Sequence, residues 1–306
     1  MSIKNKIIVT GGAGFIGAHL TRSLCKEGFE VYVVDNLVNG KKELVDKKAT
    51  LHIVDIADFK KLEEVFKKIK PNFVFHLACL PRVQYSIDFP RETNETNITG
   101  AMNVFLAAKN IGVKRVIYSA SSSAYGDQKT MPLEETMKPN PKSPYGLQKY
   151  VGELYAKVFP LVYDIEMVSL RYFNVYGPDQ PAEGGYAQAI PRFINWKKRG
   201  EPLQITGDGE QRRDCTHVYD VVAANIAAMK SKNVGKGEVI NIGSGTNFSM
   251  NEIATIIGGK IKYIPARLEP RETLADITLA KKLLNWTPKM NLKDGIKELK
   301  KLNGIK

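Results

Sequence analysis

Residues 7–28, IIVTGGAGFIGAHLTRSLCKEG, contain the clearest structural signal in the sequence. The opening apolar run is β-branched and has the length of a buried parallel strand. The glycines that follow match G-x-G-x-x-G at Gly12, Gly14 and Gly17, and G-x-x-G-x-x-G when Gly11 is counted. Apolar residues then recur at helical spacing. Glycine lets the backbone approach a pyrophosphate, and the amides at the start of a helix attract that anion. The stretch therefore predicts a strand–turn–helix unit that binds a dinucleotide, and a structural turn without a ligand is the simpler alternative.

A second predicted strand, residues 30–34, ends in Asp35. An acid at this strand end can accept hydrogen bonds from both ribose hydroxyls of NAD, and it repels the additional phosphate of NADP. The sequence therefore predicts NAD as the dinucleotide.

Composition and charge limit the remaining possibilities. A chain of 306 residues suggests one large or two moderate domains. Its apolar runs are too short to span a membrane, and the first strand follows residue 6 directly, so neither a membrane segment nor a signal peptide is expected. Three widely spaced cysteines, Cys25, Cys79 and Cys215, support neither a disulfide framework nor a zinc site and favour a cytoplasmic protein without a metal.

The net charge of +13 has two interpretations. Nucleic-acid binding is one. A lysine-rich surface is the other, and we favour it because the lysines are distributed among helices beside glutamates and no arginine-rich tract is present. No nucleic-acid partner is therefore expected, whereas an anionic small substrate would benefit from the charge.

Strand and helix patterns alternate through the first half of the chain. Strands are predicted at residues 50–54, 72–78, 114–119 and 165–172, and helices at residues 59–69, 97–110 and 145–158. This order predicts an α/β fold, a Rossmann-type doubly wound parallel sheet with a smaller mixed α/β C-terminal domain. We assign residues 1–173, with re-entry at about 216–242, to an NAD-binding domain, and residues 174–215 and 243–306 to a substrate domain.

Ligands of such sheets bind beyond the carboxyl ends of the strands. Five predicted strand ends carry Asp35, Asp55, Ala78, Ser121 and Phe173. These residues are therefore expected to converge on one site.

Tyr145 and Lys149 stand four residues apart at the start of a predicted helix, so their side chains share one face. A lysine ammonium near a phenol favours the phenolate and lowers the tyrosine pKa. Tyr145 is therefore a candidate general base near neutral pH. The spacing alone is weak, and it gains weight from the dinucleotide motif upstream.

Six blocks together resemble the extended short-chain dehydrogenase/reductase family, and within it the nucleotide-sugar 4-epimerases. They are TGGAGFIG (10–17), HLA (76–78), SSSAYG (121–126), SPYGLQK (143–149), RYFNVYGP (171–178) and GDGEQRRD (207–214). The resemblance covers nearly the whole chain and implies a UDP-sugar 4-epimerase with tightly bound NAD that is regenerated in each cycle. The reaction would pass through a transient 4-keto sugar.

The resemblance also implies the site residues. Tyr145 would take the proton of the sugar 4-hydroxyl, Lys149 would hold the nicotinamide ribose, and Ser121 would bind the reacting oxygen. His76 is expected to be structural. The expected cofactor-binding residues are Gly11, Gly14, Phe15, Ile16, Gly17, Asp35, Asn36, Asp55, Ile56, Leu77, Ala78, Asn97, Ser119, Tyr145, Lys149 and Tyr172. The expected substrate-binding residues are Ser122, Ser123, Asn174, Arg213, Arg271 and Thr273.

Related activities differ in identifiable residues. The 4,6-dehydratases and nucleotide-glucuronate decarboxylases that this chain resembles carry carboxylates where Ser122 and Ser123 stand here, so both activities are disfavoured. A UDP-glucuronate 4-epimerase and a reductase of 4-keto nucleotide sugars remain alternatives, and the reductase usually prefers NADPH. A catalytically silent NAD- or RNA-binding protein of the same fold is the non-enzyme alternative.

The sugar itself is less well defined. A small residue, Thr273, stands where relatives that exclude N-acetylated sugars carry a bulky one, and the segment at Pro270 and Arg271 is shortened. Residues 184–191 resemble those of N-acetylhexosamine epimerases. We therefore expect plain and N-acetylated UDP-hexoses to fit. The resemblance further implies a homodimer through helices near residues 97–110 and 145–158.

Overall fold

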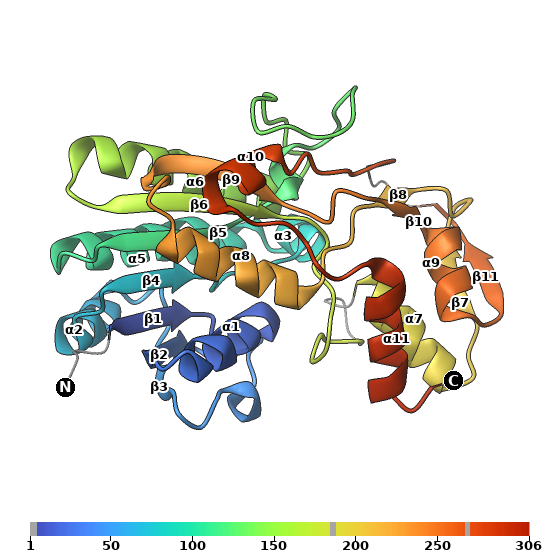
Figure 1. The fold of residues 1–306 in the computed structure, drawn as a ribbon, viewed down its shortest axis with the longest axis horizontal. Helices are drawn as coiled ribbons and strands as arrows, with labels where there is room; N and C mark the ends of the chain where they lie inside the picture. Colours follow the sequence, from blue (N-terminus) through green and yellow to red (C-terminus); the bar gives the residue numbers. More distant parts are fainter. Residues whose placement is uncertain (1–4, 184–187, 267–269, 306) are drawn as a thin grey trace.

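The computed structural model describes residues 5–183, 188–266 and 270–305. Its centre is a seven-stranded parallel sheet in the order β3-β2-β1-β4-β5-β6-β9 (Figure 1). The strands are β1 (Lys6–Thr10), β2 (Glu30–Asp35), β3 (Thr50–Ile53), β4 (Phe73–His76), β5 (Arg115–Ser121), β6 (Glu166–Tyr172) and β9 (Lys236–Ile242). The order reverses direction at β1, which is the switch point of a doubly wound sheet. The predicted fold class is confirmed.

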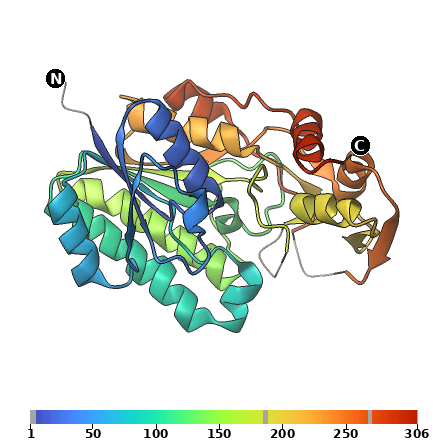
Figure 2. The same ribbon diagram turned by 90° about the horizontal axis from the view of Figure 1, so that it is seen from below.

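Helices cover both faces of this sheet, as the view from below shows (Figure 2). One layer contains α1 (Phe15–Lys26), α8 (Val218–Lys230) and α10 (Thr278–Leu284). The opposite layer contains α2 (Phe59–Ile69), α5 (Gly100–Asn110) and α6 (Pro144–Val162). Successive β1 side chains point to opposite faces, so Ile7 and Val9 join the first layer and Ile8 the second. The all-apolar strands predicted from the sequence are therefore buried on both sides.

The chain returns to the sheet twice after residue 173. Helix α8 and strand β9 lie within the range 216–242, and β9 pairs in parallel with β6 as the seventh strand. Helix α10 also packs in the sheet layer, where Ala280 and Leu284 join the core around β9. This helix falls in the range 243–306 that the sequence assigned to the substrate domain, because its short apolar pattern does not show which core it joins.

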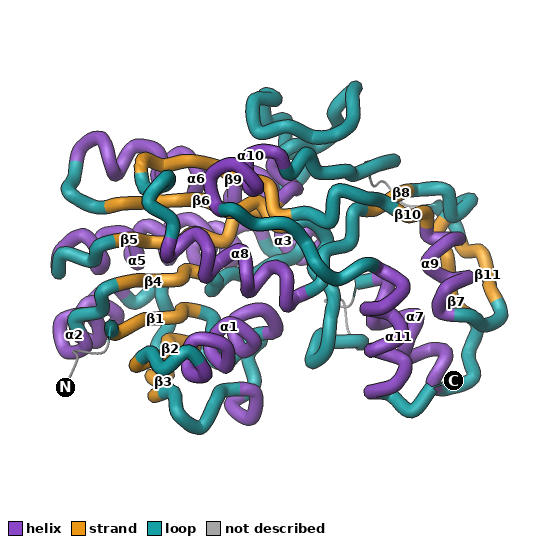
Figure 3. Tube along the Cα trace, in the orientation of Figure 1, coloured by secondary structure: helices purple, strands orange, loops and turns teal. Residues whose placement is uncertain are grey.

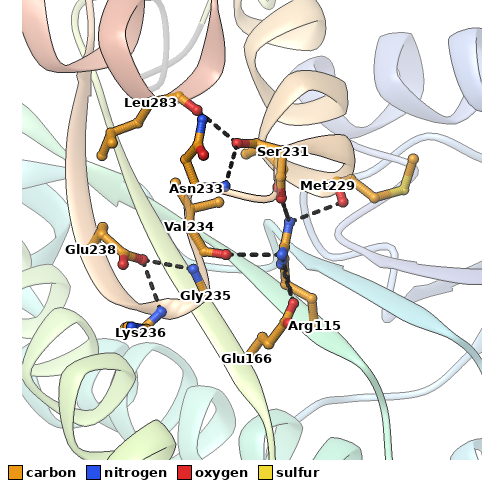
Figure 4. A network of polar contacts seen from close by, with 11 residues as sticks. Arg115, Glu166, Met229, Ser231, Asn233, Val234, Gly235, Lys236, Glu238 and Leu283 are labelled. Carbon is orange, nitrogen blue, oxygen red and sulfur yellow. Dashed lines mark hydrogen bonds and ion pairs between the residues drawn. The ribbon is translucent and has the colours of Figure 1, made fainter.

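Arg115 connects β5 to the crossover between α8 and β9 (Figure 4). Its guanidinium donates to the carbonyls of Ala228, Met229, Ser231 and Val234 at 2.7–3.0 Å, and its Nε donates to Glu166 at 2.7 Å. A cation at the carboxyl end of α8 satisfies carbonyls that have no partner within the helix. Arg115 thereby holds the returning segment onto the sheet.

A smaller mixed lobe lies beside the carboxyl ends of the strands (Figure 3). It has its own apolar core, and among its described elements two short sheets pair β7 with β11 and β8 with β10. The elements are α7 (Ala189–Lys198), β7 (Leu203–Thr206), β8 (Arg212–Arg213), β10 (Phe248–Ser249), α9 (Met250–Ile257), β11 (Ile261–Ile264) and α11 (Leu292–Leu302).

The connections over the sheet contain short helical segments: η1 (Lys42–Leu44), α3 (Val83–Asp88), α4 (Pro90–Asn94), the π-helical turn η2 (Glu95–Thr99) and η3 (Ser122–Ala124). The helix predicted over 97–110 therefore begins within a π turn. In the described part of the chain, no helix is long and apolar enough to cross a membrane.

Candidate active site

The glycine turn brings helix and strand unusually close together. A Cβ on Gly17 would lie 2.1 Å from the carbonyl oxygen of Gly11, and a Cβ on Gly11, whose φ is +71°, would lie 2.6 Å from the amide nitrogen of Ala78. Helix α1 begins after Gly14, and no side chain caps its first turn. Its amide groups and positive dipole end therefore suit a pyrophosphate.

Asp35 stands at the end of β2 beside this turn. Its carboxylate accepts hydrogen bonds from the amides of Ala13 at 3.0 Å and Leu37 at 2.8 Å. Burial raises the pKa of Asp35, and the two amide donors oppose that change. These bonds tie the orientation of the acid to the glycine turn, as recognition of a ribose diol requires.

Asp55 lies farther out along the same edge. It accepts from Ala57 N at 2.8 Å and from Asn36 Nδ2 at 2.9 Å. Its neighbour Ile56 lines the cavity described below, whereas Asp55 itself does not. Ile56 and Asn36, two of the residues expected to bind the cofactor, thus line the cavity at this edge of the sheet.

Tyr145 and Ser121 both line the cavity at the carboxyl-end edge of the sheet. The Ser121 side chain lowers the pKa of the Tyr145 phenol, against the effect of burial. Ser121 ends β5, and its Oγ contacts Ser123 Oγ at 3.1 Å. The predicted base and the predicted oxygen-binding serine therefore line one cavity.

The expected lowering of the Tyr145 pKa is wrong for this structure. Burial raises the pKa of the Tyr145 phenol, and Cys79 raises it further. Of the three groups that act on this pKa, only the Ser121 side chain lowers it. Lys149 does not offset the effect, because its Nζ donates to the backbone oxygen of Ser119 at 2.7 Å. The spacing of four residues places the two side chains on one face of the helix. It does not determine the direction in which the Lys149 ammonium points.

Asn97 positions the helix that carries Tyr145. Its Oδ1 accepts from Leu80 N at 2.8 Å, and its Nδ2 donates to Leu80 O at 3.1 Å and to Gln148 Oε1 at 2.8 Å. Gln148 in turn donates to Thr93 Oγ1 at 3.0 Å. The π turn that contains Asn97 directs its amide at α6, and π turns often mark functional sites. Sequence reasoning missed Gln148, although it precedes Lys149 within the recognised block.

His76 lies within the sheet. Its Nδ1 is 2.8 Å from Thr10 Oγ1, and burial lowers its pKa to about 3. A neutral, buried imidazole agrees with the structural role predicted for it.

The second lobe contributes Asn174 and Arg213 to the site. Asn174 Nδ2 donates to Asp214 O at 2.8 Å and to Thr273 Oγ1 at 3.3 Å. Thr273 therefore supports a cavity residue without lining the cavity itself. Arg271 forms a two-bond ion pair with Asp208, at 2.8 and 3.0 Å, on the exposed surface. The structure thus does not bring Arg271 to the site, because the carboxylate beside it in the second lobe binds it.

A cavity of about 1100 Å³ joins these groups between the two lobes. This is slightly above the range of about 300–1,000 Å³ typical of one small-molecule site, so cofactor and substrate can bind side by side. Of the predicted residues, it is lined by Gly11, Gly14, Phe15, Ile16, Gly17, Asp35, Asn36, Ile56, Leu77, Ala78, Ser119, Ser121, Ser122, Ser123, Tyr145, Tyr172, Asn174 and Arg213. Asp55, Asn97, Lys149, Arg271 and Thr273 are absent from its described lining.

Sequence reasoning also missed residues 79–84, which line the cavity directly after β4 and include Cys79 and Arg82. Their position beyond a parallel strand was the available signal. Residues 184–187 of the run compared with N-acetylhexosamine epimerases lie outside the described residues. Among the residues that are described, no group of three or more histidine, cysteine or acidic side chains could hold a metal ion.

Comparisons with known proteins agree with this geometry. The model of the NAD dependent epimerase/dehydratase family matches residues 7–243. The UDP-glucuronate 4-epimerase of Thermodesulfobacterium geofontis is 36% identical over 311 residues, covering 95% of this chain and 93% of its own.

Two solved structures of related enzymes are similar over nearly the whole chain. The UDP-glucose 4-epimerase of Thermotoga maritima, solved with UDP-glucose, is 40% identical with a TM-score of 0.91 over 95% of this chain and 96% of that one. The UDP-N-acetylglucosamine 4-epimerase of Methanobrevibacter ruminantium, solved with UDP-N-acetylmuramic acid, is 36% identical with a TM-score of 0.92 over 98% of each chain.

The uncapped helix start, the close glycine turn and the oriented Asp35 together fit a dinucleotide. The chain belongs to the NAD dependent epimerase/dehydratase family of enzymes, within the extended short-chain dehydrogenase/reductases, and NAD is its cofactor.

Proposed function

We propose that the protein is a UDP-sugar 4-epimerase that interconverts UDP-glucose and UDP-galactose and also accepts the corresponding N-acetylated sugars. The observation that carries this proposal is that Tyr145 and Ser121 line the same cavity between the lobes, where the Ser121 side chain lowers the pKa of the phenol. A proton acceptor beside an oxygen-binding hydroxyl is the pair that oxidation of a sugar hydroxyl requires.

When bound, NAD would supply a reversible hydride acceptor for the sugar's fourth carbon, and we propose that the glycine turn and Asp35 hold it throughout the cycle. Tyr145 accepts the proton of the 4-hydroxyl and returns it to the same oxygen, while Ser121 holds that oxygen. Because burial raises the pKa of Tyr145, the phenol needs added positive charge to act as a base at neutral pH. The cationic ring of the oxidised cofactor is the proposed source of that charge, while Lys149, whose ammonium is held by Ser119 O, is proposed to hold the nicotinamide ribose.

The diphosphate end of the substrate is assigned to Asn174 and Arg213 on the second lobe, which both line the cavity. Arginine's planar fork suits a diphosphate. Thr273 contributes indirectly by holding Asn174, and Arg271 is not assigned a contact because it pairs with Asp208.

The alternatives differ in what the site must supply. Dehydration or decarboxylation needs a carboxylate beside Ser121, and the 3₁₀ turn there contains Ser122 and Ser123. An NADPH-dependent reductase is disfavoured by Asp35, whose buried carboxylate would repel a ribose phosphate. Binding of UDP-glucuronate requires a cation near the sixth carbon of the sugar. The following assay distinguishes this substrate from the neutral sugars.

The test is incubation of the purified protein without added cofactor with UDP-galactose, UDP-N-acetylgalactosamine or UDP-galacturonate, followed by separation of the products. Conversion of the first two to the glucose-type isomers, abolished in Tyr145→Phe, is the expected result. Conversion of UDP-galacturonate alone would replace the proposed substrate with the uronate. No conversion of any sugar would reject the epimerase.

We further propose a homodimer through α6. Its outer face exposes an apolar row at Leu147, Leu154, Val158, Leu161 and Val162, with Leu161 79% exposed. Such a row in a water-soluble enzyme indicates a protein interface. The family resemblance supplies the partner, a second copy of this chain.

A further inference from the structure

Tyr145, Lys149 and Glu153 form one row along α6 at intervals of four residues. The first reaches the cavity. The second donates its ammonium protons to Ser119 O on β5 at 2.7 Å. The third turns to β6, where its carboxylate binds Arg171 at 2.8 Å (Oε1 to Nε) and 2.6 Å (Oε2 to Nη2). One helical row thus connects the proposed catalytic groups to two neighbouring strands.

The Glu153–Arg171 pair is buried deeply. Glu153 is 0% and Arg171 2% exposed. The Arg171 guanidinium also stacks 4.4 Å over the centroid of the Tyr125 ring, whose hydroxyl donates to Asn241 Oδ1 at 2.7 Å. Burying two charges costs free energy, and an apolar pair of equal volume is often at least as stable. The ion pair therefore calls for an explanation other than overall stability.

Helix α6 fits the sheet too closely to slide. A Cβ on Gly152 would lie 2.2 Å from the hydroxyl oxygen of Tyr118 on β5. Beside that contact, the two-bond fork fixes the rotation and the axial position of the helix, because both oxygens must meet both nitrogens. Tyr145 and Lys149 lie on this same rigid helix, so the fork also fixes their positions.

The carboxylate also acts on Lys149 through charge. The cations that act on Glu153 are Arg171 from β6 and Lys157 and Lys149 from its own helix. Tyr118 is the titratable group that faces it from β5. The negative charge of Glu153 therefore lies among the charges that surround Lys149, the lysine that is proposed to hold the nicotinamide ribose.

We propose that the Glu153–Arg171 ion pair is a positioning device for the reaction: it sets the placement of α6 on the sheet and the charge around Lys149. Neither residue lines the cavity among its described residues, so both act through Tyr145 and Lys149. The test by kcat and KM rests on the proposed epimerase activity. The test by NAD affinity rests only on the cofactor of the family.

Glu153→Gln keeps the shape and removes the charge. We expect kcat to fall about 10- to 100-fold with KM for the UDP-sugar changed less than about threefold, since misplacement of reacting groups by about 1 Å has effects of this size. The affinity for NAD falls with it, measured by calorimetry on apoprotein.

The double variant Glu153→Met/Arg171→Met separates positioning from stability. We expect a thermal midpoint at or above the wild-type value, with kcat and NAD affinity still reduced. Glu166→Gln is the matched control, since it removes the partner of another sheet arginine, Arg115, at the opposite ends of the strands. It is expected to leave kcat unchanged.

Wild-type kcat and NAD affinity in the double variant would overturn the proposal. If the double variant does not fold, Glu153→Asp decides the question. It retains the charge but shortens the side chain that makes the two bonds to Arg171, so kcat should fall with little change in KM. An unchanged kcat in both single variants would overturn the proposal. If the wild type epimerises no sugar, the proposed function fails, and NAD affinity across the same variants still tests the positioning device.

Discussion

Replacement of Arg115 by methionine should destabilise the protein by about 3–5 kcal/mol. Methionine keeps much of the side-chain volume and removes all five donated hydrogen bonds. The bonds to Ala228, Met229 and Val234 are fully buried, and an orphaned buried acceptor costs about 1–3 kcal/mol. Three carbonyls near the lower end of that range give the stated sum, and the half-exposed pair with Glu166 adds little to it.

Arg115→Lys should lose about half as much, because one ammonium cannot reach carbonyls that bind two separate guanidinium nitrogens. The control is Lys67→Ala, which removes an exposed ion pair with Glu63 at 2.7 Å and should cost at most about 0.5 kcal/mol.

Urea unfolding followed by circular dichroism and by tryptophan fluorescence measures these differences. Trp286 is a suitable probe, since its indole donates to Asp220 O on α8 at 3.0 Å. Coincident transitions with an unchanged slope license the comparison. A loss below about 1 kcal/mol for Arg115→Met would refute the reasoning and mean that water or relaxation satisfies the carbonyls.

Three further predictions concern the cofactor turn, acid stability and assembly. Gly17→Ala places a Cβ 2.1 Å from Gly11 O, so NAD affinity measured by calorimetry should fall at least about 100-fold; unchanged affinity would contradict the close turn. His76 has a folded pKa of about 3 against about 6.5 unfolded, so below pH 6.5 the unfolded state binds the proton first. The free energy of unfolding should then fall by about 1.4 kcal/mol per pH unit towards pH 3 on account of this residue, and His76→Gln should flatten that slope in urea titrations at pH 7 and 5. Leu154→Asp with Leu161→Asp should convert a dimer to a monomer in light scattering, with secondary structure retained, and a monomeric wild type would reject the proposed interface.

Local patterns predicted the parallel sheet because central strands such as β1 and β4 are buried on both faces and therefore read as apolar runs, whereas the edge strand β3 is partly exposed. Alternation with helices then leaves few topologies. The convergence of Asp35, Ala78 and Ser121 was predictable for the same reason, since all parallel strands end at one edge. Asp55 and Phe173, which were expected to join them, are not among the described residues that line the cavity.

Sequence periodicity was less informative where partners come from elsewhere in the chain. Helix α10 packs beside β9 because residues distant in sequence form its core, and Arg271 binds Asp208 because the second lobe places a carboxylate in its reach. Neither contact can be recognised from the local pattern of apolar residues.

The amino-acid sequence by itself determined the class of fold, the glycine turn with its acid, and the row of Tyr145 and Lys149 on one helix, since each depends on spacing within a short segment. Only the tertiary structure decided the electrostatics: burial raises the pKa of Tyr145, Lys149 turns to Ser119 O, and Arg171 meets Glu153 within the core. Charge and desolvation depend on which groups surround a side chain in space, and packing of distant segments sets those surroundings.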